Sequence, residues 1–159
     1  MIAGTGQQGS TTGTSRVPFR ARFSYRVLWA DCDSNRHMYY PNYFKMFDSS
    51  THNLFEQAGA PVPELLAAYG LRGLFIVDAH AAYRAGCGWG DEIAVESHIS
   101  EWKRRTFKVS HALWNGDVLA AEGHEIRVWG VPHPDDPERS AAGEIPAEFR
   151  ARLDGGDDR

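Results

Sequence analysis

The chain has little that points to a membrane, a secretory route or nucleic acid. Its apolar stretches fall well short of the roughly 20 residues that a helix needs to cross a bilayer. The first residues lack the basic and then apolar pattern of a secretory signal. The formal net charge is -4 at pH 7, so no overall positive field attracts DNA or RNA. We therefore expect a cytoplasmic protein that binds neither a membrane nor nucleic acid.

Cysteine and the common catalytic motifs are also scarce. The two cysteines, Cys32 and Cys87, lie far apart and without the spacing of metal ligands, so free thiols are expected. No Gly-x-Ser-x-Gly, His-Glu-x-x-His or strand-linked Gly-x-Gly-x-x-Gly occurs, and the histidines are scattered. These absences argue against an α/β-hydrolase, a metal site and a bound nucleotide cofactor.

Both ends of the chain are poor in apolar residues. Residues 1–16 consist mainly of Gly, Thr, Gln and Ser, and residues 154–159 are Asp, Gly and Arg. Such segments bury too little apolar surface to offset the entropy lost on ordering, so we predict disordered tails. The 137 or so residues between them suit one domain, spanning 17–153.

Alternating apolar and polar residues predict five strands. In the first, the odd positions are apolar and the even positions polar, which is typical of a strand with one buried face. Asn115 and Gly116 form a hairpin turn between the last two strands, because both residues tolerate a positive φ. The predicted strands cover 20–29, 74–84, 92–99, 105–114 and 117–130.

A long apolar helix separates the first strand from the others. It begins near Pro41, carries apolar residues at spacings of three and four, and ends at Gly59. Shorter helices are predicted over 62–69 and 146–153. With one sizeable helix after the first strand, the later strands must pair as antiparallel neighbours. We predict an α+β hotdog fold, in which a curled five-stranded antiparallel sheet wraps around one long central helix.

Three motifs resemble those of the 4-hydroxybenzoyl-CoA thioesterase family. They occupy residues 31–33 (Asp-Cys-Asp) with 40–44 (Tyr-Pro-Asn-Tyr-Phe), residues 100–107 (Ser-Glu-Trp-Lys-Arg-Arg-Thr-Phe), and residues 125–128 (Glu-Ile-Arg-Val). The resemblance extends over about 19–149. It implies the hotdog fold, hydrolysis of an acyl-CoA thioester, and a homodimer or homotetramer whose pocket lies at the subunit interface.

Asp33 precedes the N-terminus of the long helix. A helix N-terminus offers unpaired N–H groups and a positive dipole end, which stabilise the oxyanion that develops on a thioester carbonyl. An aspartate is ionised at neutral pH without special tuning. The resemblance makes Asp33 the catalytic carboxylate and the Tyr40 N–H the oxyanion donor. From the residues alone, Asp33 remains equally compatible with a helix cap or turn.

Several other residues are candidates around the acyl group. At the position of His37 the aromatic-acyl enzymes of the family carry an apolar residue. A histidine four residues after the aspartate is similar to the arrangement in fatty-acyl thioesterases of the same fold. His37 either orients Asp33, polarises the substrate or satisfies the loop. The resemblance places Asp48 near the acyl group, where it would accept a hydrogen bond from a phenol; a solvent-facing role is the alternative. Leu74 and Phe75 are expected to line the acyl pocket.

The cations Lys103, Arg104 and Arg105 are candidates for binding the phosphate groups of coenzyme A. Clustered cations bind phosphate through charge-assisted hydrogen bonds, although a solvated basic strand end is the simpler alternative. The sequence thus predicts an acyl-CoA thioesterase in which CoA is part of the substrate and no separate cofactor is needed. A fatty-acyl-CoA or acyl carrier protein thioesterase, and a non-catalytic acyl-CoA binding module, remain as alternatives.

Overall fold

The computed structural model describes residues 17–155. The tail predicted over 1–16 and the end of the chain from 156 lie outside the described residues. Asp154, which we assigned to the C-terminal tail, ends the last helix and accepts a hydrogen bond from the Trp102 indole at 2.6 Å. No helix within 17–155 is long and apolar enough to span a membrane.

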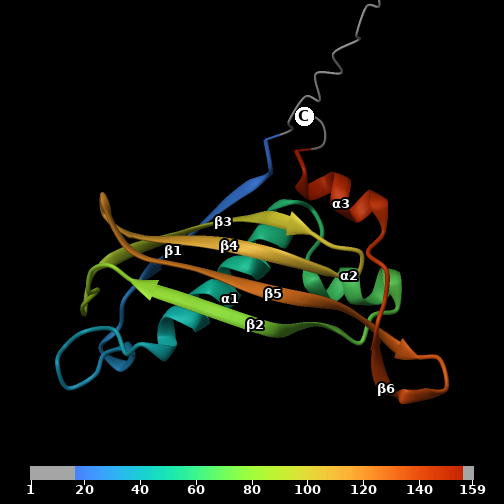
Figure 1. The fold of residues 1–159 in the computed structure, drawn as a ribbon. Helices are drawn as coiled ribbons and strands as arrows, with labels where there is room; N and C mark the ends of the chain where they lie inside the picture. Colours follow the sequence, from blue (N-terminus) through green and yellow to red (C-terminus); the bar gives the residue numbers. More distant parts are fainter. Residues whose placement is uncertain (1–16, 156–159) are drawn as a thin grey trace, which may run out of the picture.

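The helices and strands follow the predicted order closely (Figure 1). A short 3-10 turn, Trp29–Asp31, takes the place of the end of the first predicted strand. The strands are β1 Arg20–Arg26, β2 Gly73–Tyr83, β3 Glu92–Trp102, β4 Thr106–Asn115, β5 Val118–His133 and β6 Asp136–Ala142; the helices are α1 Pro41–Gln57, α2 Val62–Tyr69 and α3 Ala147–Leu153.

The strands form one antiparallel sheet in the order β1-β3-β4-β5-β2, with β6 paired to the end of β5. The predicted hotdog fold is confirmed, but in the part of the chain that the structure describes the sheet has six strands and not five. Strand β6 was not predicted because its residues, Asp136–Ala142, are polar or small and include Pro137. Most of them are exposed, so no alternating pattern was required of them.

Helix α1 lies across one face of the curled sheet (Figure 1). Its buried face consists of Tyr43, Met46, Phe47, Ser50, Thr51, Leu54 and Phe55. Gly123 on β5 lets the helix approach closely, because a Cβ there would lie 2.4 Å from the Phe47 ring. The helix ends as predicted, since Gly59 adopts a φ of 70° that favours glycine.

Strand β2 corrects one prediction. Its alternation indicated a half-buried strand, yet Phe75, Ile76 and Val77 are 42%, 46% and 60% exposed. The strand lies at the edge of the sheet, where it pairs only with β5. A register shift between Ile76 and Asp78 also interrupts the alternation of the two faces. The β2 edge is therefore an apolar surface that faces outward.

Candidate active site

The loop between β1 and α1 is built around Asp31. Its buried carboxylate accepts hydrogen bonds from the Tyr25 hydroxyl at 2.7 Å and the Leu28 N–H at 2.9 Å. Its backbone carbonyl accepts from the Asn42 amide at 2.9 Å, which ties the loop to the first turn of α1. The hydrogen bond to this carboxylate raises the pKa of Tyr25. Asp31 thus holds the loop in place, because its carboxylate is buried and its oxygens accept hydrogen bonds from three parts of the chain.

Asp33 lies in a tight turn held by three hydrogen bonds. Its N–H donates to the His37 carbonyl at 2.9 Å, and its own carbonyl accepts from the Arg36 N–H at 3.0 Å. Its Oδ1 accepts from the Asn35 N–H at 2.8 Å. Arg36 adopts a φ of 65°, an unusual value for a residue other than glycine. The side chain is partly exposed, and Oδ2 has no hydrogen-bond partner among residues 17–155.

The N-terminus of α1 lies just beyond this turn and is not capped by a side chain. Tyr40 is the N-cap residue, and no described residue accepts a hydrogen bond from its N–H. A pocket of about 360 Å³ opens here, lined among others by His37, Tyr40, Tyr43 and Tyr83. The Tyr83 hydroxyl donates to the Tyr40 carbonyl at 3.3 Å, and burial raises the pKa of Tyr43. A free N–H thus lies at the rim of an open, aromatic pocket.

His37 forms part of the wall of this pocket. Its backbone makes a bridge to Gly88, and its imidazole packs on Gly86, where a Cβ would lie 2.3 Å from Nδ1. Gly86 therefore leaves the space that the ring occupies. His37 was predicted from its motif but Gly86 was not, because nothing in a single sequence shows which glycine faces a distant ring.

Asp48 lies further along α1, and the guanidinium of Arg127 holds it in place. Arg127 Nη2 donates to Asp48 at 2.5 Å and to the buried Glu125 carboxylate at 2.7 Å. The Thr51 hydroxyl donates to the same Glu125 oxygen at 2.9 Å. The Asp48 side chain is 47% exposed, whereas those of Arg127 and Glu125 are 4% and 2% exposed. Asp48 is the exposed end of a charge network that reaches into the core.

A buried histidine completes this network. The His111 Nδ1 lies 2.7 Å from the Ser97 hydroxyl, and its Nε2 lies 3.7 Å from Glu125 without a hydrogen-bond partner among the described residues. Burial lowers the pKa of His111, which keeps the ring neutral. Burial alone would raise the pKa of Glu125, but the His111 and Arg127 side chains beside it lower it. The two carboxylates of Asp48 and Glu125 therefore share one guanidinium, and only that of Asp48 reaches the surface.

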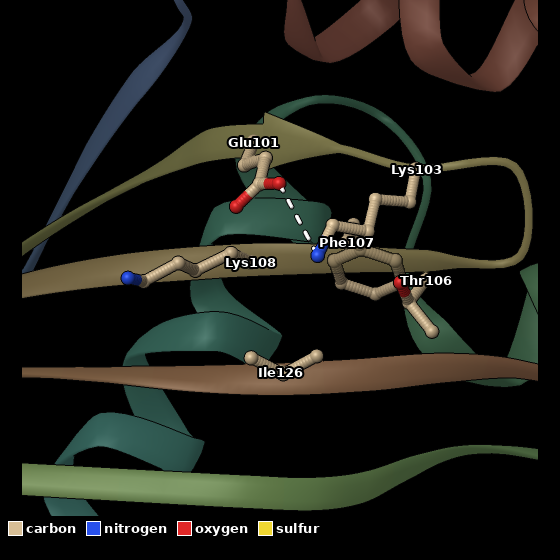
Figure 2. A pocket seen from close by; sticks show the side chains of 6 residues that line it. All are labelled: Glu101, Lys103, Thr106, Phe107, Lys108 and Ile126. Atoms are coloured by element: carbon tan, nitrogen blue, oxygen red, sulfur yellow. Dashed lines mark ion pairs between the residues drawn. The ribbon is translucent and has the colours of Figure 1, made fainter.

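The predicted cation cluster forms the turn between β3 and β4. The Lys103 ammonium lies 3.4 Å from the Glu101 carboxylate, above the face of the sheet that carries Lys108 and Ile126 (Figure 2). Arg104 pairs with Glu144 at 3.1 Å. Lys103 and Arg104 line an open groove of about 700 Å³ between this turn and α3. Arg105 is exposed in the same turn.

Apart from Asp48, which lies within α1, the predicted site residues come from segments at opposite ends of the sheet: the loop before α1 at one end, and the turn between β3 and β4 with the start of β2 at the other (Figure 1). Asp33, His37 and Tyr40 gather at one end. The basic turn lies at the other end, separated by the 11 residues of β3, which span roughly 33 Å at about 3.3 Å per residue. Leu74 and Phe75 also lie at the basic end, where Leu74 pairs with Trp129 and the Phe75 ring packs on Gly130.

The architecture and the helix-terminal site together define a hotdog-fold enzyme. Residues 27–153 match the family model described as the Thioesterase-like superfamily. The chain is 32% identical over 130 residues to the 4-hydroxybenzoyl-CoA thioesterase of Pseudomonas sp. (strain CBS-3). The matched residues make up 78% of this chain and 90% of that relative. The chain belongs to the Thioesterase-like superfamily, and its activity is that of a thioester hydrolase.

Solved structures agree with this assignment. An aspartate-to-asparagine mutant of 4-hydroxybenzoyl-CoA thioesterase in complex with 4-hydroxybenzoyl-CoA superimposes with a TM-score of 0.77 and 26% identity, over 85% of this chain and 99% of that chain. A gentisyl-coenzyme A thioesterase superimposes with a TM-score of 0.71 and 28% identity, over 84% and 98% of the two chains.

Proposed function

We propose that this protein hydrolyses an aromatic acyl-CoA, with Asp33 as the catalytic carboxylate and the Tyr40 N–H as the oxyanion donor. The observation that carries the proposal is the N-terminus of α1, which no side chain among the described residues caps. It lies just after the turn that holds Asp33, and its N-cap residue Tyr40 lines an open pocket. The thioester carbonyl would accept a hydrogen bond from this N–H. The Asp33 carboxylate attacks the acyl carbon or activates a water molecule, and both routes release the free acid and the CoA thiol.

The acyl group is expected to be a ring that carries a hydrogen-bond donor. Asp48 presents a carboxylate whose Oδ1 is fixed by Arg127 and whose side chain is half exposed. A ring hydroxyl would satisfy this acceptor, whereas an alkyl chain would desolvate it without replacement. The relatives named above are a 4-hydroxybenzoyl-CoA and a gentisyl-CoA thioesterase, whose acyl groups are hydroxylated aromatic rings, which supports this choice.

A panel of acyl-CoAs tests this proposal. Thiol release should be fastest for hydroxybenzoyl-CoA, and benzoyl-CoA should have a kcat/KM lower by about tenfold or more because the Asp48 carboxylate loses its hydrogen-bond donor. Short-, medium- and long-chain acyl-CoAs and a matched acyl carrier protein thioester complete the panel. A preference for alkyl chains or for the carrier protein would support the alternatives, and no hydrolysis of any member would indicate a binding module.

We also infer that the active enzyme is a homodimer formed through the β2 edges, and that two such dimers can form a tetramer. Strand β3 is roughly 33 Å long, for ten steps of about 3.3 Å, and it runs from the end of the sheet near Asp33 to the basic turn, so we infer that the two parts of one site come from different chains. Antiparallel pairing of two β2 strands would place the start of β2 in one chain beside the end of β2 in its partner, which brings the basic end of one sheet next to the Asp33 end of the other. The unpaired, apolar edge at Ile76 and Val77 is the kind of edge that needs covering.

The substitution Val77→Lys tests the dimer. A charge at this edge should prevent strand pairing, so that sedimentation shows a monomer and kcat/KM falls by more than about tenfold, as expected when half of each site is lost. Val118→Lys is the matched control, because Val118 is 55% exposed on the hairpin at the far end of β5. An active monomeric wild-type protein would contradict the inference.

A further inference from the structure

We propose that Arg150, on the C-terminal helix α3, is a positioning residue that holds the turn 103–105 ready for the phosphate groups of CoA. The inference rests on the proposed function, because it takes this turn as the phosphate-binding segment. Nothing in the sequence motifs marks Arg150, which lies 47 residues beyond Lys103. Its assignment comes from its contacts.

The Arg150 guanidinium bonds to two successive carbonyls of the turn. Its Nη2 donates to the Lys103 carbonyl at 2.7 Å and to the Arg104 carbonyl at 3.2 Å. Its central carbon also lies 5.6 Å from the centre of the Trp102 ring, a cation–π contact. A planar guanidinium can make all three contacts at once, whereas a lysine ammonium cannot rest flat on a ring and bridge two carbonyls.

The rest of the turn is anchored around this contact. The Ile145 N–H donates to the Arg104 carbonyl at 3.0 Å, and the Trp129 N–H donates to the Arg105 carbonyl at 3.0 Å. Asp154 in turn fixes the Trp102 indole on which Arg150 rests. The carbonyl oxygens of the turn are therefore engaged by donors and carry less unbalanced negative charge toward a phosphate.

Lys103 and Arg104, two of the three cations of the turn, are available to such a ligand. Lys103, Arg104 and Arg150 line the same open groove. In the free protein Lys103 and Arg104 pair with Glu101 and Glu144, but all four side chains are more than half exposed. Exposed pairs of this kind contribute little, so a phosphate can replace the carboxylates. What Arg150 supplies is a fixed backbone, which lowers the ordering cost of binding.

The test compares an acyl-CoA with the same acyl group on pantetheine, which lacks the nucleotide and its phosphates. Arg150→Ala should raise the KM for the acyl-CoA about tenfold, because a loosened turn no longer holds one of its cations for a well-formed charge-assisted contact with the phosphate. The kcat should stay within about twofold, because bound substrate still meets an intact Asp33. Both constants for the pantetheine thioester should stay unchanged.

Matched variants separate positioning from charge and from folding. Arg152→Ala on the same helix removes an arginine that, among residues 17–155, bonds only to the Gly59 carbonyl, at 3.1 Å, and should not change the KM. Arg150→Lys keeps the charge but should recover less than half of the loss on a logarithmic scale. Full recovery, or a KM for Arg150→Ala within about twofold of wild type, overturns the positioning role. An equal loss on pantetheine also overturns it, because that pattern indicates general misfolding.

A further variant distinguishes failure of this inference from failure of the proposed function. Lys103→Ala should raise the KM for the acyl-CoA and leave the pantetheine thioester unaffected. If Lys103→Ala has this effect and Arg150→Ala does not, only the role of Arg150 is wrong. If neither variant changes the KM, CoA does not bind at this turn, and both the inference and the CoA assignment are wrong.

Discussion

Asp33→Asn is expected to lower kcat on the best acyl-CoA by a factor on the order of 10² to 10⁴, the usual contribution of a positioned carboxylate. The amide is uncharged, so it neither attacks the acyl carbon nor accepts a proton from water. The turn should survive, because asparagine keeps an oxygen for the Asn35 N–H that Oδ1 of Asp33 now accepts. We therefore expect the loss in kcat with little change in KM or in the free energy of unfolding.

Asp31→Asn is the matched control for that measurement. The Asp31 carboxylate is buried and accepts hydrogen bonds from the Tyr25 hydroxyl and the Leu28 N–H. Replacing its charge should lower the free energy of unfolding by about 1–2 kcal/mol, with a far smaller change in kcat than Asp33→Asn causes. Stopped-flow thiol release and urea unfolding measure the two effects. Unchanged turnover in Asp33→Asn would eliminate the carboxylate mechanism.

The fold was readable because most of its elements carry local signals. The spacing of apolar residues, the proline at the start of α1 and the glycines after both helices predicted the bounds of α1 and α2 within one or two residues. Strand β2 shows the limit of such patterns. Alternation marks it as a strand, but whether its apolar side chains are covered depends on its place at the sheet edge. That place follows from the pairing of β5 with both β4 and β2, which no local pattern contains.

The site was only partly readable, for a similar reason. Asp33 and Tyr40 are close in sequence, so one motif contains both. The contact between Arg150 and the basic turn joins segments 47 residues apart, and a single chain without coordinates offers no way to pair them. The charge network had a weak signal: Glu125 and Arg127 alternate with Ile126 and Val128, so both must point to one face of β5. Which face is buried was not evident.

That network leads to the second large effect, which concerns stability. Glu125→Leu should lower the free energy of unfolding by about 3–5 kcal/mol, the usual cost of removing one partner of a buried ion pair. The Arg127 guanidinium is 4% exposed and would keep only Asp48, which lies at the surface. The Thr51 hydroxyl would lose its acceptor at the same time. Urea unfolding with an unchanged m-value would measure the loss directly.

The double variant Glu125→Leu with Arg127→Met shows whether the loss of stability comes from the buried Arg127 charge that has lost its partner. Two apolar side chains of similar size should restore most of the lost stability, because neither leaves an uncompensated ion in the core. Arg22→Ala is the control, since the Arg22–Glu96 pair at 3.0 Å is exposed and should contribute less than about 1 kcal/mol. If the double variant is as unstable as Glu125→Leu alone, the loss arises from packing and not from charge. If stability returns but the preference for a hydroxylated ring disappears, the network serves to hold Asp48 in place for its ligand.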